Sequence, residues 1–132
     1  MKNELNRDLL RDSLDKIGLL TSIDNEGDLR TVLSADEDFG HDVVIYYLIR
    51  EGWLGVHAFA KNLNLKMTEQ EALKFVNEFN CSTKLPKAYI KNGDLYLEHW
   101  IVIESNFSKE FLRKSLQYLT GYVWHAFCDM KL

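Results

Sequence analysis

The sequence predicts an α+β fold in which helices pack on an antiparallel sheet. Three segments with helical periodicity are separated by runs of strand-forming residues, and these runs are joined by hairpin turns. Strand–helix–strand crossovers are few, so a parallel sheet is not favoured. The predicted order is helix, three strands, helix, two strands, helix. Since the 132 residues contain no repeat or linker, we expect one domain, residues 1–132.

Composition and charge exclude several classes of protein. The chain is 46% hydrophobic, and its 16 basic and 20 acidic residues give a net charge of −4. This balance argues against a nucleic-acid binder and against a polybasic membrane anchor. The longest apolar run, Val43–Ile49, is far shorter than the ~18–20 residues of a membrane helix. With no apolar leader, we expect a cytoplasmic protein whose Cys81 and Cys128 are free thiols.

The first part of the chain predicts one helix followed by a weaker strand. The helix should span Glu4–Ile17 and end at Gly18, which favours a left-handed stop. A polar turn at Asp24–Asp28 precedes a weak strand, "LRTVLSA", and a second polar turn follows at Asp36–Asp42. The apolar stripe of the helix comprises Leu5, Leu9, Leu10, Leu14 and Ile17.

The middle of the chain predicts a hairpin and a second helix. In "VVIYYLIREGWLGVHAFA" two strand-forming runs flank Arg50-Glu51-Gly52, and the first run lacks alternation, as in a strand buried on both faces. Thr68 and Glu71 have the spacing of a capping box, so a helix should begin there. Its expected buried stripe is Ala72, Leu73, Phe75, Val76 and Phe79.

"PKAYIKNGDLYLEHWIVIE", residues 86–104, predicts a second hairpin around Asn92-Gly93, a pair that suits a type I′ turn. Alternation along its long strand predicts a buried face of Leu95, Leu97, His99, Ile101 and Ile103. The wetter face should carry Tyr96, Glu98, Trp100, Val102 and Glu104. Ser108 should then cap a final helix. The core stripe of that helix is Leu112, Leu116, Leu119, Val123 and Phe127.

No catalytic motif, metal site or cofactor site is predicted. Glu98 and Glu104 share a strand face but lie roughly 20 Å apart at ~3.3 Å per residue, too far for an acid–base pair. A calcium loop starting at Asp24 fails, because position twelve is Ala35. The remaining alternative is that His57 and His99 meet across neighbouring strands, which with Glu98 would make a small cluster.

Aromatic residues are the feature left without a role. Seven Phe, six Tyr and three Trp are many for so small a core. They either pack beneath the helices or form a surface for a partner, where Trp and Tyr are the usual anchors. The candidate protein-binding residues are Trp53, Tyr96, Trp100, Tyr122 and Trp124.

The segment from Phe75 to Phe127 resembles the YbjN-like domain family. It shows a helix ending in Phe-Asn, a short strand led by proline, a Gly-Asp turn, a strand "LYLEHWIVIE" and a helix capped by serine. The resemblance implies the fold of type III secretion chaperones, which are dimers that bind unfolded segments of secreted effectors. It also implies a sensory transduction regulator without catalytic residues.

Two functional hypotheses follow. The first is a non-enzymatic protein-interaction module that binds or regulates another protein as a homodimer, with no cofactor and no nucleic-acid or membrane partner. The second is a small-molecule or metal-dependent enzyme built on His57, His99 and Glu98. The second requires these three side chains to converge in one cleft.

Overall fold

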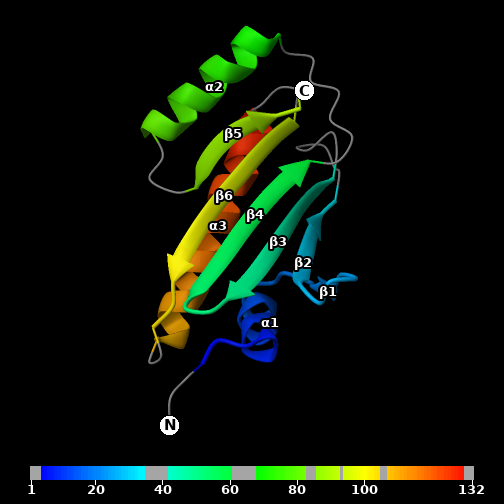
Figure 1. The fold of residues 1–132 in the computed structure, drawn as a ribbon, viewed down its shortest axis with the longest axis vertical. Helices are drawn as coiled ribbons and strands as arrows, with labels where there is room; N and C mark the ends of the chain where they lie inside the picture. Colours follow the sequence, from blue (N-terminus) through cyan, green and yellow to red (C-terminus); the bar gives the residue numbers. More distant parts are fainter. Residues whose placement is uncertain are drawn as a thin grey trace.

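The computed structural model describes residues 4–34, 42–60, 68–82, 86–92, 94–104 and 107–129. These residues form the predicted α+β fold, with one strand more than expected (Figure 1). The predicted turn at Asp36–Asp42 lies outside them apart from Asp42, and so does Gly93. The elements are α1 (Arg7–Lys16), β1 (Ser22–Ile23), β2 (Leu29–Leu33), β3 (Val43–Arg50), β4 (Trp53–Ala60), α2 (Glu69–Ser82), β5 (Lys87–Lys91), β6 (Asp94–Val102) and α3 (Lys109–Asp129).

All six strands form one antiparallel sheet in the order β1-β2-β3-β4-β6-β5. Both predicted hairpins are present. In the first, Gly52 has φ +74° in the turn between β3 and β4, a conformation that glycine adopts without strain. In the second, Asn92 has φ +52°, as a type I′ turn requires. Strand β6 lies between β4 and β5, so the strand carrying the family resemblance is internal to the sheet.

The additional strand, β1, is created by the polar turn at Asp24–Asp28. One carboxylate oxygen of Asp24, Oδ1, accepts hydrogen bonds from the backbone amides of Glu26 and Asp28, both at 2.9 Å. Gly27 takes φ +86° in this turn. The chain therefore reverses and pairs Ser22 and Ile23 with β2. Two residues are too few for a periodic pattern, which is why the sequence did not predict this strand.

Side-chain caps define the starts of the helices. Asn6 accepts from the Leu9 amide at 2.8 Å, so α1 begins at Arg7 and not at Glu4 as predicted. Thr68 accepts from the Glu71 amide at 3.1 Å, which confirms the predicted cap of α2. Ser108 caps α3 in the same way, accepting from the Phe111 amide at 3.2 Å. Gly18, with φ +85°, follows the end of α1 as expected.

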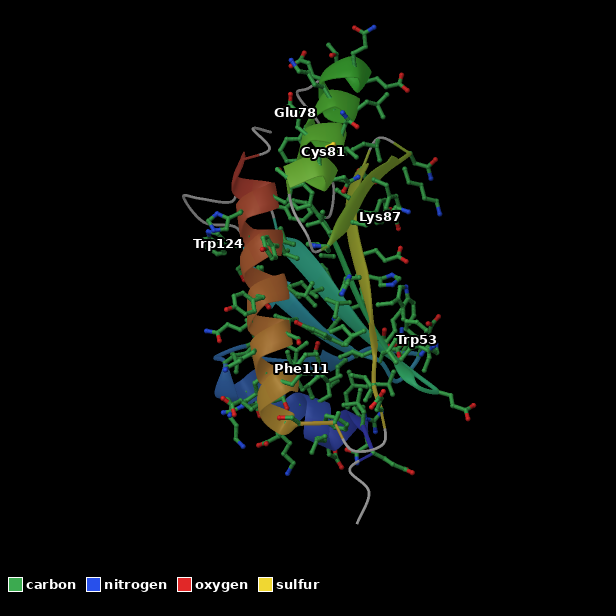
Figure 2. The ribbon with its side chains drawn as sticks, turned by 90° about the vertical axis from the view of Figure 1, so that its left-hand side faces the viewer. Trp53, Glu78, Cys81, Lys87, Phe111 and Trp124 are labelled. Atoms are coloured by element: carbon green, nitrogen blue, oxygen red, sulfur yellow. The ribbon has the colours of Figure 1, made fainter. Side chains whose placement is uncertain are left out.

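The core lies between α3 and one face of the sheet. Helix α3 runs along that face, and α1 contacts α3 near one end (Figures 1 and 2). The predicted stripe of α3 is fully buried, and it packs with the inward-facing side chains of β2, β3, β4 and β6. The buried side chains of the sheet include Leu29, Val43, Ile45, Tyr47, Leu54, Val56, Leu95, Leu97 and Ile101.

Helix α2 lies beside β5, at the edge of the sheet (Figure 1). Ala72 is buried, whereas Phe75, Val76 and Phe79 are partly buried. Leu73 is 52% exposed, so its predicted burial is wrong: α2 covers only a strand edge, and this contact is narrower than the predicted stripe. Asn80 completes the contact with two hydrogen bonds to the backbone of Ala88, from its amide group to the carbonyl (3.0 Å) and from the Ala88 amide to its Oδ1 (2.8 Å).

Among the described residues Cys81 is an exposed free thiol, and the Cys128 side chain lies outside them. None of the helices that the structure describes is long and apolar enough to cross a membrane.

Candidate functional site

The face of the sheet opposite α3 is the candidate site, and we call it the open face. In Figure 2, where the sheet is seen from its edge, α3 lies along one side of the sheet, and none of the described helices packs on the other side. Strand alternation turns every second side chain of β3, β4, β6 and β5 toward this face. The open face includes Tyr46, Leu48, Trp53, His57, Phe59, Lys87, Tyr89, Tyr96, Glu98, Trp100 and Val102. Val44 of β3 also turns to this side of the sheet, but it is buried.

Four rings form a continuous row across the open face, which we call the aromatic ladder: Tyr46, Phe59, Tyr96 and Tyr89. Successive ring centroids are 5.7, 5.8 and 5.4 Å apart. Strand register produces the row, because Phe59 and Tyr89 both lie directly opposite Tyr96. Such pairs contribute ~0.5–1.5 kcal/mol each beyond their buried area. The ladder therefore stabilises the sheet and also presents aromatic faces to solvent.

Glu98 is the polar centre of the open face. Its Oε1 accepts from the Trp100 indole at 2.9 Å, its Oε2 accepts from the Tyr89 hydroxyl at 3.1 Å, and His57 Nε2 lies 3.9 Å from Oε1. Partial burial would raise the pKa of Glu98. The hydrogen bonds from Trp100 and Tyr89, the charge that His57 carries when it is protonated and the charge of Lys87 outweigh it, so the pKa is lowered. Glu98 is therefore an ionised acceptor that fixes two aromatic side chains.

His57 lies directly opposite Glu98 but stays neutral at pH 7. Burial lowers its pKa more than the nearby carboxylate raises it. Its Nε2 has no hydrogen-bond partner among the described residues. Its ring packs edge-to-face with the Trp100 ring, and the two ring centroids are 5.3 Å apart. His57 thus completes the surface around Trp100 as a neutral ring.

The predicted cluster of His57, His99 and Glu98 does not form. His99 lies opposite Val56, one residue out of step with the His57–Glu98 pair, so alternation turns it to the helix-covered face. Burial there lowers the pKa of His99. The described part of the chain contains no group of three side chains suited to hold a metal.

A hollow of about 580 Å³ lies between the aromatic ladder and the turn that joins β1 to β2. The ladder and His57 form its floor, and the turn forms its wall. The hollow is within the size range of ligand sites in proteins, roughly 300–1,000 Å³. Its lining is Ile23, Asp24, Asn25, Glu26, Asp28, Arg30, Tyr46, Leu48, His57, Phe59, Tyr89 and Tyr96.

The structure separates the five aromatic residues predicted to bind a protein. Trp53, Tyr96 and Trp100 lie on the open face, where Trp53 is 46% exposed. Tyr122 and Trp124 belong to α3, on the other side of the sheet, and Trp124 packs partly against the core. The five residues therefore do not make one surface.

Sequence reasoning missed half of the open face. Tyr46, Phe59 and Tyr89 were not predicted site residues, although they contribute three of the four rings of the ladder. Phe59 alternates with the buried residues of β4, and Tyr89 alternates with the buried Ala88 of β5. That alternation was the signal that could have placed them with Tyr96.

Comparison with known proteins gives a family and a fold. A family model for YbjN, described as "Putative bacterial sensory transduction regulator", matches residues 6–119. The chain is also similar to a solved structure, "Crystal structure of YbjN, a putative transcription regulator from E. coli". That match has a TM-score of 0.70 and 13% identity, and covers 98% of this chain and 93% of the other. No curated protein matches the sequence.

Proposed function

The chain belongs to the YbjN family, whose model is described as "Putative bacterial sensory transduction regulator". From this premise we propose that it is a non-enzymatic cytoplasmic module that binds another protein through its open face. The observation that carries the proposal is an aromatic sheet face that none of the described helices covers. Exposed apolar surface of this kind marks interaction sites in globular proteins.

The composition of the open face supports a protein ligand. Aromatic side chains are enriched at protein interfaces, since they offer large contact area at a small cost in side-chain entropy. The most exposed apolar pair is Trp53 and Val102, which lie directly opposite each other on β4 and β6. Both are available to a partner without any movement of the core.

The enzyme hypothesis receives less support from the same residues. Of the three side chains that this hypothesis needs, only His57 and Glu98 share a face of the sheet. Both carboxylate oxygens of Glu98 already accept hydrogen bonds, one from Tyr89 and one from Trp100. This arrangement serves to position Trp100 and Tyr89.

A paired set of variants tests the proposal. Proteins captured by crosslinking in bacterial cells would be identified by mass spectrometry, and the affinity of the purified partner would then be measured. We expect Trp53→Ser combined with Val102→Ser to weaken binding at least about tenfold, as truncation of interface aromatics often does. The matched control is Leu73→Ser, an exposed apolar residue of α2 that takes part in neither proposed interface.

The two outcomes separate the possible surfaces. If Leu73→Ser lowers affinity and the open-face pair does not, the open face is not the binding site. If the purified parent protein binds none of the captured candidates, the protein does not act through stable binding of another protein.

We also propose that the protein is a homodimer. Its support is a second exposed apolar region, on α3, where Phe111 is 54% exposed and Tyr118 is 67% exposed. Light scattering after size-exclusion chromatography at high micromolar concentration should give the mass of two chains. A mass of one chain would refute the dimer and leave the open-face proposal intact.

A further inference from the structure

We propose that the hollow beside the aromatic ladder receives an arginine or lysine side chain from the partner protein. This inference rests on the proposed function, because it takes the partner to be a protein bound at the open face. It adds the chemistry of one contact: a cation held between aromatic faces and the carboxylates of the β1–β2 turn.

The floor of the hollow suits a cation. Tyr46, Phe59, Tyr89 and Tyr96 all line it, and each ring is half-buried, with part of its surface open to the hollow. Aromatic faces attract guanidinium and ammonium groups within about 6 Å of the ring, by ~0.5–1 kcal/mol at exposed sites and more where water is excluded. The flat stack of Tyr89 on Tyr96, with 12° between the ring planes, offers the broadest such face.

The wall of the hollow is negative. Among the described residues that line it, Asp24, Glu26 and Asp28 are acidic and Arg30 is basic, so three negative charges face one positive charge. The Nε of Arg30 donates to Ser22 Oγ at 3.1 Å, which holds that side chain against β1. His57 adds no charge at pH 7, because burial lowers its pKa.

The turn fixes the Asp24 carboxylate, and the carboxylates of the wall keep acceptor capacity. The turn amides occupy only Oδ1 of Asp24, and Glu26 is exposed. Arg50 Nη1 approaches Asp28 Oδ1 at 3.7 Å, a loose contact that partly offsets the charge of Asp28. A cation entering from the partner would therefore find Glu26 and the second oxygen of Asp24.

The apolar lining fits the rest of the side chain. Ile23 and Leu48 also line the hollow, between the turn and the ladder. The methylene stem of lysine or arginine packs well on such surface while its charged end reaches polar groups. A neutral aromatic or aliphatic side chain could fill the same volume, but it would leave Glu26 and the second oxygen of Asp24 without a charged partner.

Selection from a random decapeptide library by the immobilised protein tests this inference. We expect enriched peptides to share an arginine or lysine next to apolar or aromatic residues. One selected peptide would be remade with citrulline in place of its arginine, which removes the charge and keeps the shape. The neutral peptide should bind about five- to tenfold more weakly, the effect of one or two charge contacts at a half-exposed site.

Matched variants test whether the carboxylates of the β1–β2 turn are the groups that attract the cation. Glu26→Gln combined with Asp28→Asn should weaken the arginine peptide by about the same factor and leave the citrulline peptide unaffected. Glu69→Gln combined with Glu78→Gln makes an equal change of net charge on α2, away from the hollow, and should leave both affinities unchanged.

The results test the cation inference separately from the proposal that a protein binds at the open face. Enriched peptides without a cation, or equal binding of the arginine and citrulline peptides, would overturn the cation inference while open-face binding stands. If no peptide is enriched, or if the enriched peptides bind a Phe59→Ala variant of unchanged thermal stability as tightly, both are overturned.

Discussion

The indole of Trp100 packs against Gly55, the residue directly opposite it on the neighbouring strand, and occupies the space where a side chain would lie. A Cβ built on Gly55 would lie 2.7 Å from two ring atoms of Trp100, closer than side chains approach one another. A glycine inside a strand normally weakens it, because there is no side chain to pack. Here the ring of Trp100 supplies that contact, and the Glu98 carboxylate holds the ring in place.

We expect Gly55→Ala to destabilise the protein by about 1–3 kcal/mol, the usual cost of overpacking a fitted site. The ring must move, and with it the hydrogen bond to Glu98. Chemical denaturation would give the free energy of unfolding. Tryptophan fluorescence would report the displacement of Trp100 in the folded state.

Gly121→Ala is the matched control for this substitution. Gly121 lies inside α3, and a Cβ there would meet nothing within 4 Å. Alanine should therefore raise stability by up to ~1 kcal/mol through its higher helix propensity. Equal effects of the two substitutions would show that Trp100 does not constrain position 55.

Tyr47 carries a buried hydroxyl that costs stability. The residue is 1% exposed, and neither its hydroxyl nor that of Thr31 has a hydrogen-bond partner among the described residues. We expect Tyr47→Phe to raise the free energy of unfolding by about 1 kcal/mol, because it removes an unpaired polar group and keeps the ring. Tyr118→Phe, on the exposed side of α3, should change nothing.

Tyr47 should also lower the stability of the protein at alkaline pH. Burial raises the pKa of Tyr47 from 10.0 to about 12. Between these values the unfolded chain loses the phenolic proton and the folded chain keeps it, so stability falls as pH rises. Denaturation at several alkaline pH values should show a smaller loss in Tyr47→Phe than in the parent protein. An equal loss in both would contradict the prediction.

Mild acid should destabilise the protein through His57 and His99. Burial lowers the pKa of both below the ordinary value of 6.5. As pH falls through that value, the unfolded chain takes up protons that the folded chain does not, so the free energy of unfolding declines. We expect a smaller decline between pH 7 and pH 5 in His57→Gln. His125→Gln, at an exposed position of α3, should keep the decline of the parent protein.

Glu98 should affect stability in a lower pH range than the two histidines do. Its pKa lies below the ordinary 4.5, because hydrogen bonds and positive charge outweigh its burial. The stability that it contributes is therefore present above that value and is lost as pH falls through its folded pKa. Glu98→Gln should reduce the loss below pH 5. It should deepen the decline between pH 7 and pH 5, because the carboxylate that raises the pKa of His57 is removed.

Asn80 should control how firmly α2 holds the edge of the sheet. Its side chain makes two hydrogen bonds to the backbone of Ala88. We expect Asn80→Ala to speed amide exchange at Ala88 and in α2 by about tenfold or more, since each bond contributes ~0.5–1.5 kcal/mol. Hydrogen–deuterium exchange would measure this. Asn77→Ala, at an exposed position of the same helix, should leave the exchange rates unchanged.

Local patterns predicted the elements well because local forces determine them. The stripe of α3 and the alternation of β6 follow from burial on one side, and the caps at Thr68 and Ser108 follow from unpaired amides. The two-residue strand β1 was missed because its position depends on the Asp24 turn. The exposure of Leu73 was missed because the sequence does not say how wide a surface α2 covers.

The candidate site was only half predicted, for a reason of a different kind. Alternation correctly placed Tyr96, Glu98 and Trp100 on one face of β6. The neighbours of that face come from strand order and register, which join Tyr46, Phe59 and Tyr89 from three other strands. Register also decided against the histidine cluster, since a shift of one residue separates His57 from His99.

The floor of the hollow is made of strands and its wall is a surface turn, and the two should tolerate substitution differently. The floor belongs to strands whose other face is the core, so a substitution there risks the fold. The wall is a surface turn, and turns tolerate replacement far better than strands do. Exchange of the short segment from Asp24 to Asp28 should thus redirect which ligand is accepted while the strands keep their packing.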